Sequence, residues 1–231
     1  MTNKIIDPLT NEEIKAAADR RVDIIKSEFD NGFEFVSNHP RSVSFFGSAR
    51  FKEDHPYYLK ARRLAHRITT ELKYSIVSGG GPGIMEAANR GAKEVGGKSL
   101  GLNIRLPHEQ KGNPYLTEEM NFTYFFTRKV CLSYAAEAYL FFPGGFGTLD
   151  EFFEIITLVQ TGKIPRVPIF LVGKDFWRVM HDFIINTLMK VGTISPNDID
   201  LYRVTDDEDL ILETIREAPV RNGIRFEDGV F

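Results

Sequence analysis

Two glycine-rich segments carry the residues best suited to chemistry, Ser78-Gly-Gly-Gly-Pro-Gly-Ile-Met-Glu86 and Phe142-Pro-Gly-Gly-Phe-Gly-Thr-Leu-Asp-Glu151. Each follows an apolar run and opens an amphipathic one. Glycines let an anion approach the backbone, and a following helix offers unpaired N–H groups at the positive end of its dipole. Both segments are therefore candidate phosphate cradles, the first through Gly80 and Gly81. A plain strand-to-helix turn is the alternative for that first segment.

The first segment lacks the spacing of the dinucleotide-binding fingerprint, and it does not end in the Gly-Lys-Ser/Thr of a Walker motif. This counts against ordinary dinucleotide binding and against ATP hydrolysis. The first turn would hold a phosphate or a ribose, and the pair of turns supports one shared site.

Glu151 is the candidate catalytic carboxylate. Helical spacing places it on one face with Thr148 and Ile155, so its carboxylate is expected beside the second glycine turn in partly apolar surroundings. Thr148-x-x-Glu151 also fits a capping box, in which both residues would only satisfy the first N–H groups of a helix. Both interpretations stay open at this point.

Arg128 and Lys129 begin a predicted helix. Two cations at a helix N-terminus oppose the helix dipole, at about 0.3–1 kcal/mol each. A substrate phosphate or a carboxylate such as Glu151 is expected to compensate, and arginine can hold either through two parallel hydrogen bonds. A solvated surface pair is the alternative. Ser48, after the first predicted strand, is a further donor for the same phosphate.

Short apolar runs alternate with amphipathic stretches from Arg41 onward, which predicts an α/β fold: a Rossmann-like parallel sheet with helices on both faces. Ligands of such sheets bind outside the carboxyl ends of the strands, so both glycine turns should face one crevice. The expected strands are 43–47, 74–78, 98–104, 122–126, 138–142 and 167–172, and the expected helices are 56–72, 83–96, 128–136, 148–161 and 174–190.

The 231 residues are expected to form a single nucleotide-binding domain. Its core is 41–192. Residues 1–40 form an N-terminal helical extension with a helix at 11–37, and residues 193–231 form a peripheral C-terminal segment.

A formal net charge of −3 gives no general attraction to nucleic acid or to anionic lipid. The single cysteine, Cys131, excludes an internal disulfide and a multi-cysteine metal site, and packing is its expected role. The chain shows neither an export signal nor an apolar run of membrane-spanning length. We therefore expect a cytoplasmic protein that binds neither nucleic acid nor membrane.

The two glycine segments, with Arg128-Lys129 between them, resemble the LOG (Lonely Guy) family over about residues 41–192. The resemblance implies a phosphoribohydrolase that cleaves the N-glycosidic bond of a nucleoside 5′-monophosphate, such as AMP or a cytokinin riboside monophosphate, to the free base and ribose 5-phosphate. It implies that the reaction needs no metal or cofactor and that Arg128 and Glu151 are the catalytic pair. It also implies that the substrate contacts Lys129, Gly144, Gly145, Phe146, Gly147 and Thr148, with further contacts from Glu109 and Thr157.

Two features are typical of a bacterial branch of this family: Glu86, where plant members usually carry glycine, and the N-terminal helix. The resemblance also implies a homodimer or larger homo-oligomer. A non-catalytic nucleotide or molybdenum-cofactor binding or carrier protein of the same fold is the alternative, and such a protein does not need Arg128 and Glu151 as a pair. Lysine decarboxylation is disfavoured because no lysine stands in a convincing site for the pyridoxal cofactor it requires.

Overall fold

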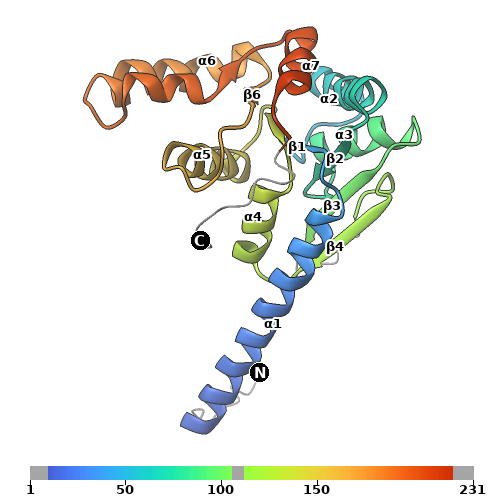
Figure 1. Cartoon of the computed structure of the whole chain (residues 1–231), viewed down its shortest axis with the longest axis vertical. Coiled ribbons are helices and arrows are strands. Elements are labelled where there is room, and N and C mark those ends of the chain that lie inside the picture. Colours follow the sequence, from blue (N-terminus) through green and yellow to red (C-terminus); the bar gives the residue numbers. More distant parts are fainter. Residues whose placement is uncertain (1–9, 106–111, 221–231) are drawn as a thin grey trace, which may run out of the picture.

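The structure, a computed structural model, describes residues 10–105 and 112–220. A seven-stranded sheet in the order β4-β3-β2-β1-β5-β6-β7 lies between two layers of helices (Figure 1). Every neighbouring pair of strands is parallel. The predicted α/β, Rossmann-like parallel sheet with helices on both faces is confirmed.

The central strands are buried on both faces because each alternate side chain enters a different core. Val43 and Phe45 of the first strand pack in one apolar cluster, whereas Phe46 packs in the other. The strands are β1 (Ser42–Phe46), β2 (Ser75–Ser78), β3 (Ser99–Ile104), β4 (Glu118–Phe122), β5 (Ala138–Phe141), β6 (Ile169–Leu171) and β7 (Arg203–Val204).

The helices divide between the two faces of the sheet as the two apolar clusters do. One face is covered by α2 (Pro56–Arg67) with its π-helical continuation η1 (Ile68–Leu72), α3 (Ile84–Lys93) and α7 (Glu208–Glu217). The other is covered by α4 (Phe125–Tyr134), α5 (Phe146–Gln160) and α6 (Lys174–Phe183), followed by the π-helical η2 (Ile184–Met189) and the 3-10 helix η3 (Pro196–Leu201).

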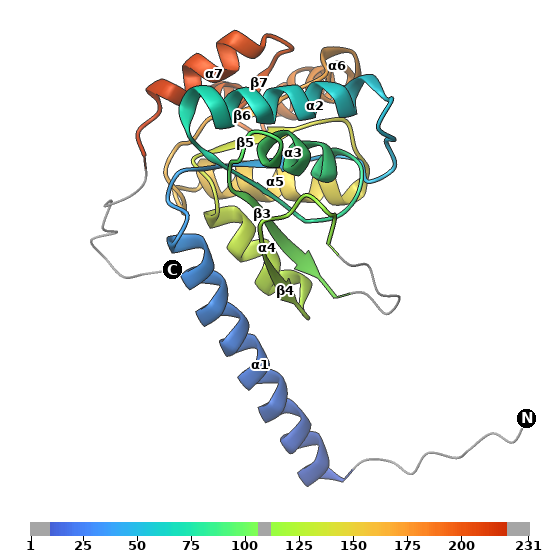
Figure 2. The same ribbon diagram turned by 90° about the vertical axis from the view of Figure 1, so that its right-hand side faces the viewer.

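The N-terminal helix α1 (Asn11–Ser37) projects away from this body, and only its C-terminal part meets the other elements (Figures 1 and 2). It begins sharply because Thr10 and Glu13 form a capping box. Among the described residues, no helix combines the length and the apolar character needed to cross a membrane.

One predicted strand is wrong: residues 122–126 do not form a strand, and β4 ends where that prediction begins. Glu118 and Glu119 are exposed in this edge strand, so its residues lack the apolar run that indicates a buried strand. Backbone pairing with β3, from Leu100 opposite Glu118 to Ile104 opposite Phe122, holds it in the sheet.

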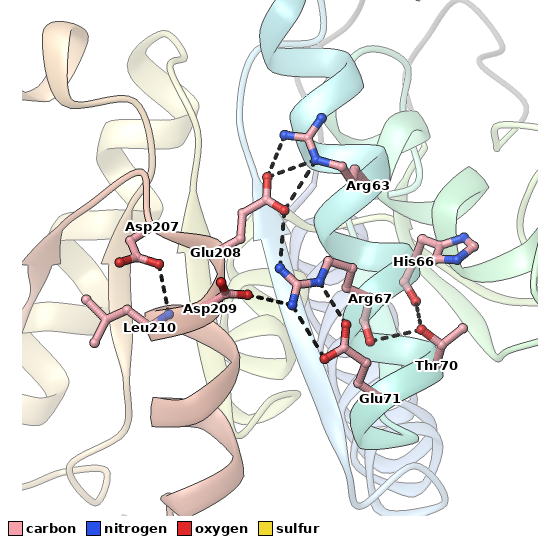
Figure 3. Close-up of polar contacts among 9 residues, drawn as sticks. All are labelled: Arg63, His66, Arg67, Thr70, Glu71, Asp207, Glu208, Asp209 and Leu210. Atoms are coloured by element: carbon pink, nitrogen blue, oxygen red, sulfur yellow. Dashed lines mark hydrogen bonds and ion pairs between the residues drawn. The ribbon is translucent and has the colours of Figure 1, made fainter.

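The C-terminal segment is not peripheral, because it adds β7 to the sheet and α7 to the core. Ion pairs fasten the N-terminal end of α7 to α2, with Arg63 reaching Glu208 at 2.6 Å and Arg67 reaching Asp209 at 2.7 Å (Figure 3). The sequence missed this role because β7 has only two residues. The α7 side chains in the core are Ile211, Leu212 and Ile215.

The strand order reverses between β1 and β5. From β1 the chain moves outward through β2 and β3 to β4, and it then returns to place β5 on the other side of β1. A parallel sheet opens a crevice at such a reversal, outside the carboxyl ends of the two strands. The second glycine turn follows β5 at this point, and the first follows β2, which lies on the other side of β1.

Candidate active site

The turns that follow β1, β2 and β5 are joined through the backbone of one residue. The Ser48 N–H donates to the Pro143 carbonyl at 3.0 Å, and the Ser48 carbonyl accepts from the Ile84 N–H at 3.0 Å. Gly83 has a φ of +71°, and a Cβ there would lie 2.3 Å from the Ser48 carbonyl oxygen. Glycine at this position is therefore required to bring the two glycine turns together.

These three turns, with α4 and α5, enclose a cleft of about 620 Å³. It lies at the carboxyl ends of the central strands, where the topology places a ligand site. The predicted site residues that line it are Ser48, Arg128, Lys129, Gly145, Phe146, Gly147, Thr148 and Glu151.

The N-terminus of α5 opens into the cleft without a cap. Its N-cap is Gly145, and no side chain bonds its first N–H groups. Within the described part of the chain, the N–H groups of Gly145, Phe146 and Gly147 have no hydrogen-bond acceptor. The capping-box interpretation is wrong, because Thr148 lies inside the first turn of α5 rather than before it. The end of the helix is thus open to an anion.

Glu151 lies on the buried face of α5, with 7% of its surface exposed. Its Oε2 is buried without a hydrogen-bond partner among the described residues. Burial raises the pKa of Glu151 to about 7, although the charge of Arg128 lowers it, and the nearby Glu154 raises it further. A carboxyl group with this pKa can change its protonation state near neutral pH, as a general acid or base does.

Arg128 lies over the first glycine turn. Its Nε donates to the Leu102 carbonyl at 2.7 Å, and a Cβ on Gly79 would lie 2.2 Å from its Nη2. Within the described ranges, no ion pair of 4.0 Å or less joins Arg128 to Glu151, so the direct grip that the sequence suggested is absent. The two charges act through space: burial lowers the pKa of Arg128, and Glu151 opposes this.

Lys129 bridges α4 and α5 through two carboxylates. Its Nζ lies 2.8 Å from Asp150 and 3.0 Å from Glu154. Burial lowers the pKa of Lys129, but the hydrogen bonds to Asp150 and Glu154 outweigh this and raise it. The lysine therefore stays charged and holds the two helices that carry Arg128 and Glu151 side by side.

The anion at the N-terminus of α4 is Glu28 of α1, which the sequence analysis did not consider. Because α4 begins at Phe125, Arg128 and Lys129 lie a turn inside the helix rather than at its start. Glu28 accepts hydrogen bonds from the Thr123 N–H and the Thr127 hydroxyl, both at 2.5 Å. Glu28 shares the buried face of α1 with Gly32, four residues on, and a carboxylate on that face is the signal that could have pointed to it.

Four predicted site residues lie elsewhere. The Gly80 N–H donates to the Ser78 hydroxyl at 2.9 Å, so it serves the turn itself. Gly81 and Gly144 do not line the cleft. The Thr157 hydroxyl is exposed and donates to the Phe153 carbonyl at 2.6 Å. Glu109 lies outside the described residues.

Several cleft-lining side chains were not predicted, namely Arg50, Met85, Phe125 and Asp150. Two phenylalanine rings are exposed at this cleft, Phe125 at 58% and Phe146 at 93%. Large apolar rings at a cleft are typical of sites that bind flat aromatic groups. In the described residues, no cluster of three or more His, Cys, Asp or Glu side chains is placed to hold a metal ion.

Several known proteins are similar to this chain in sequence. The family model described as "Possible lysine decarboxylase" matches residues 85–215. Cytokinin riboside 5′-monophosphate phosphoribohydrolase LOG7 of Arabidopsis thaliana is 30% identical over 71% of this chain and 75% of its own length. The chain belongs to the LOG family. Another similar protein is the pyrimidine/purine nucleotide 5′-monophosphate nucleosidase of Escherichia coli, 26% identical over 66% of this LOG-family chain but 36% of its own length.

Solved structures share the fold. The molybdenum cofactor carrier protein of Chlamydomonas reinhardtii superposes with a TM-score of 0.52 at 18% identity, over 76% of this chain and 96% of its own. At this identity the similarity supports the architecture of the LOG-family chain and nothing finer.

Proposed function

We propose that this protein hydrolyses the N-glycosidic bond of a nucleoside 5′-monophosphate, such as AMP or a cytokinin riboside monophosphate. The observation that carries the proposal is the buried carboxylate of Glu151, whose Oε2 has no hydrogen-bond partner in the described part of the chain. It lies in the cleft one turn beyond the uncapped N-terminus of α5. Relatives named as a phosphoribohydrolase and as a nucleotide nucleosidase support the same reaction.

The phosphate binds at the N-terminus of α5. The N–H groups of Gly145, Phe146 and Gly147 supply donors, and the positive end of the helix dipole favours the negative charge. A Cβ at Gly145 or Gly147 would meet no atom within 4 Å, so the backbone there is open to a ligand. Arg50, which also lines the cleft, adds a positive charge.

Glu151 acts on the ribose. Cleavage gives C1′ partial positive charge as the bonding electrons leave with the base, and a nearby carboxylate stabilises that charge. Water then bonds to C1′ through its oxygen and gives one proton to the Glu151 carboxylate, while the departing base, which holds the bonding electrons, takes up one proton from solvent. Glu151 releases its proton to solvent afterwards, so the products are ribose 5-phosphate and the neutral free base, with one water consumed. The positive charge of Arg128 favours the ionised form of Glu151 that this role requires.

The base is expected against the exposed rings of Phe125 and Phe146, since both line the cleft that holds the phosphate site. Stacking on an aromatic ring accepts any base, because every base has a π-face. The arrangement therefore supports a nucleotide ligand without selecting purine over pyrimidine.

The test is to incubate the purified protein with AMP and to follow free adenine by chromatography. We expect adenine and ribose 5-phosphate in equal amounts, and no adenine from the Glu151→Gln variant. Glu213→Gln, the same exchange on the exposed face of α7, serves as the control and should retain full activity. Saturable AMP binding without adenine release would instead support the non-catalytic binding or carrier protein.

Self-association is part of this proposal, as the resemblance implies. Large apolar side chains are exposed on α6 and at the cleft, as an interface between subunits would require. Sedimentation equilibrium should give a mass at least twice that of the chain, and a monomer at all concentrations would contradict this. The exposed side chains on α6 are Phe176, Val179 and Phe183.

A further inference from the structure

Helix α1 lies outside the sheet, and its C-terminal part runs beside α4 (Figures 1 and 2). Gly32 is buried, and a Cβ there would lie 2.4 Å from the Cys131 sulfur of α4 and 3.3 Å from the Phe122 ring. Only glycine allows the two helices to approach this closely. The approach brings the preceding turn of α1, which carries Glu28, to the N-terminus of α4.

Glu28 caps the N-terminus of α4. Its carboxylate, 7% exposed, accepts from the Thr123 N–H and the Thr127 hydroxyl at 2.5 Å each and from the Tyr124 N–H at 3.3 Å. Burial raises the pKa of Glu28, but these hydrogen bonds outweigh it and lower the pKa, so the carboxylate is ionised. A negative charge here also stabilises α4 through its dipole.

Three consecutive residues of α4 then point to three different parts of the molecule. Thr127 bonds Glu28 of α1, Arg128 bonds the Leu102 carbonyl beside the first glycine turn, and Lys129 bonds carboxylates of α5. Thr127 and Arg128 are adjacent in α4, so both contacts depend on the position of the same stretch of backbone. The N-terminal helix is thus connected to the cleft through a single turn.

We propose that Glu28 is a positioning residue for the proposed hydrolysis: it fixes the first turn of α4 and so holds the Arg128 guanidinium at the glycine turn facing the cleft. The inference rests on the proposed function. It gives the N-terminal helix a role in the site, and this role cannot be read from the glycine motifs or from the Arg128-Lys129 pair.

The test is Glu28→Gln, which keeps the size of the side chain but removes its charge. The new NH₂ group cannot accept a hydrogen bond, so it would lose one of the donors that Glu28 now binds. We expect kcat for AMP hydrolysis to fall by about 10- to 100-fold, the effect of a displacement near 1 Å in a catalytic group, with a smaller change in KM. The pKa of Glu151 should rise, because Arg128 no longer lowers it. Asp30→Asn is the matched control, since Asp30 is exposed on the same helix and pairs with Lys26.

Two readouts separate this inference from the proposed function. Adenine release from the wild-type protein tests the function, whereas the Glu151 pKa, followed by carbon-13 NMR of its carboxyl group, reports the position of Arg128 even without turnover. An upward shift of that pKa in folded Glu28→Gln supports the inference. Unchanged pKa and unchanged kcat in the folded variant overturn it. If Glu28→Gln does not fold, Thr127→Val removes one of the same hydrogen bonds and is judged by the same two readouts.

Discussion

Replacing Glu151 with glutamine is expected to stabilise the fold while it abolishes turnover. The buried carboxyl group has a pKa of about 7, against an ordinary value of 4.5. The folded state therefore holds this proton more tightly than the unfolded state does. Below pH 4.5 the group is neutral in both states and destabilises nothing. Between pH 4.5 and 7 the group ionises in the unfolded state but stays largely protonated in the folded state, which increasingly favours unfolding. Above pH 7 it is ionised in both states, and the loss of folding stability stays constant.

The size of the effect follows from the two pKa values. At about 1.4 kcal/mol per pH unit, the difference corresponds to about 3 kcal/mol at pH 8 and to less than about 1 kcal/mol at pH 5. Glutamine occupies the same space without a charge, so Glu151→Gln should recover most of this. A gain of this size is large beside the typical stability of a domain, about 5–15 kcal/mol.

Urea denaturation of wild type and variant at pH 5 and pH 8 measures the free energies of unfolding directly. The exposed Glu213→Gln exchange should change neither value. If Glu151→Gln were no more stable than wild type at pH 8, or if its advantage were the same at pH 5, Glu151 would not be a strained buried acid. Its assignment as the catalytic carboxylate would then lose its physical basis.

Three further predictions concern the cleft. The value of kcat/KM for AMP should rise with pH and level off above the Glu151 pKa of about 7, because the ionised carboxylate is the active form; a fall between pH 6 and 8 would mean that the protonated form acts. Phe146→Ala should weaken AMP binding by about 5- to 100-fold through lost stacking, and calorimetry should find ribose 5-phosphate affinity unchanged; equal losses for both ligands would assign Phe146 to the phosphate alone. Gly79→Ala places a Cβ 2.2 Å from the Arg128 Nη2, so kcat should drop by about 10-fold or more; an unchanged kcat would show that the position of Arg128 is unimportant.

The parallel sheet could be predicted because its inner strands are buried on both faces and read as apolar runs between amphipathic helices. The two edge strands could not. Glu118 and Glu119 give β4 a polar, exposed sequence, and β7 has only two residues. Backbone hydrogen bonds to a neighbouring strand hold such strands in the sheet, and the residue types of the strand do not reveal these bonds.

The site could be predicted in part. Glycine turns at strand ends must meet at one edge of a parallel sheet, so the neighbourhood of Gly145 and Glu151 followed from topology. The contact of Glu28 with Thr127 links residues far apart in sequence, and no local pattern reveals it. The side-chain direction of Arg128, toward the Leu102 carbonyl rather than Glu151, likewise depends on packing.

The most direct measurement is a crystal structure of the Glu151→Gln variant with AMP bound. We predict that the phosphate oxygens accept hydrogen bonds from the N–H groups of Phe146 and Gly147, and that the side chain at position 151 faces C1′ of the ribose. A phosphate bound away from the N-terminus of α5, or a ribose beyond the reach of residue 151, would contradict the account.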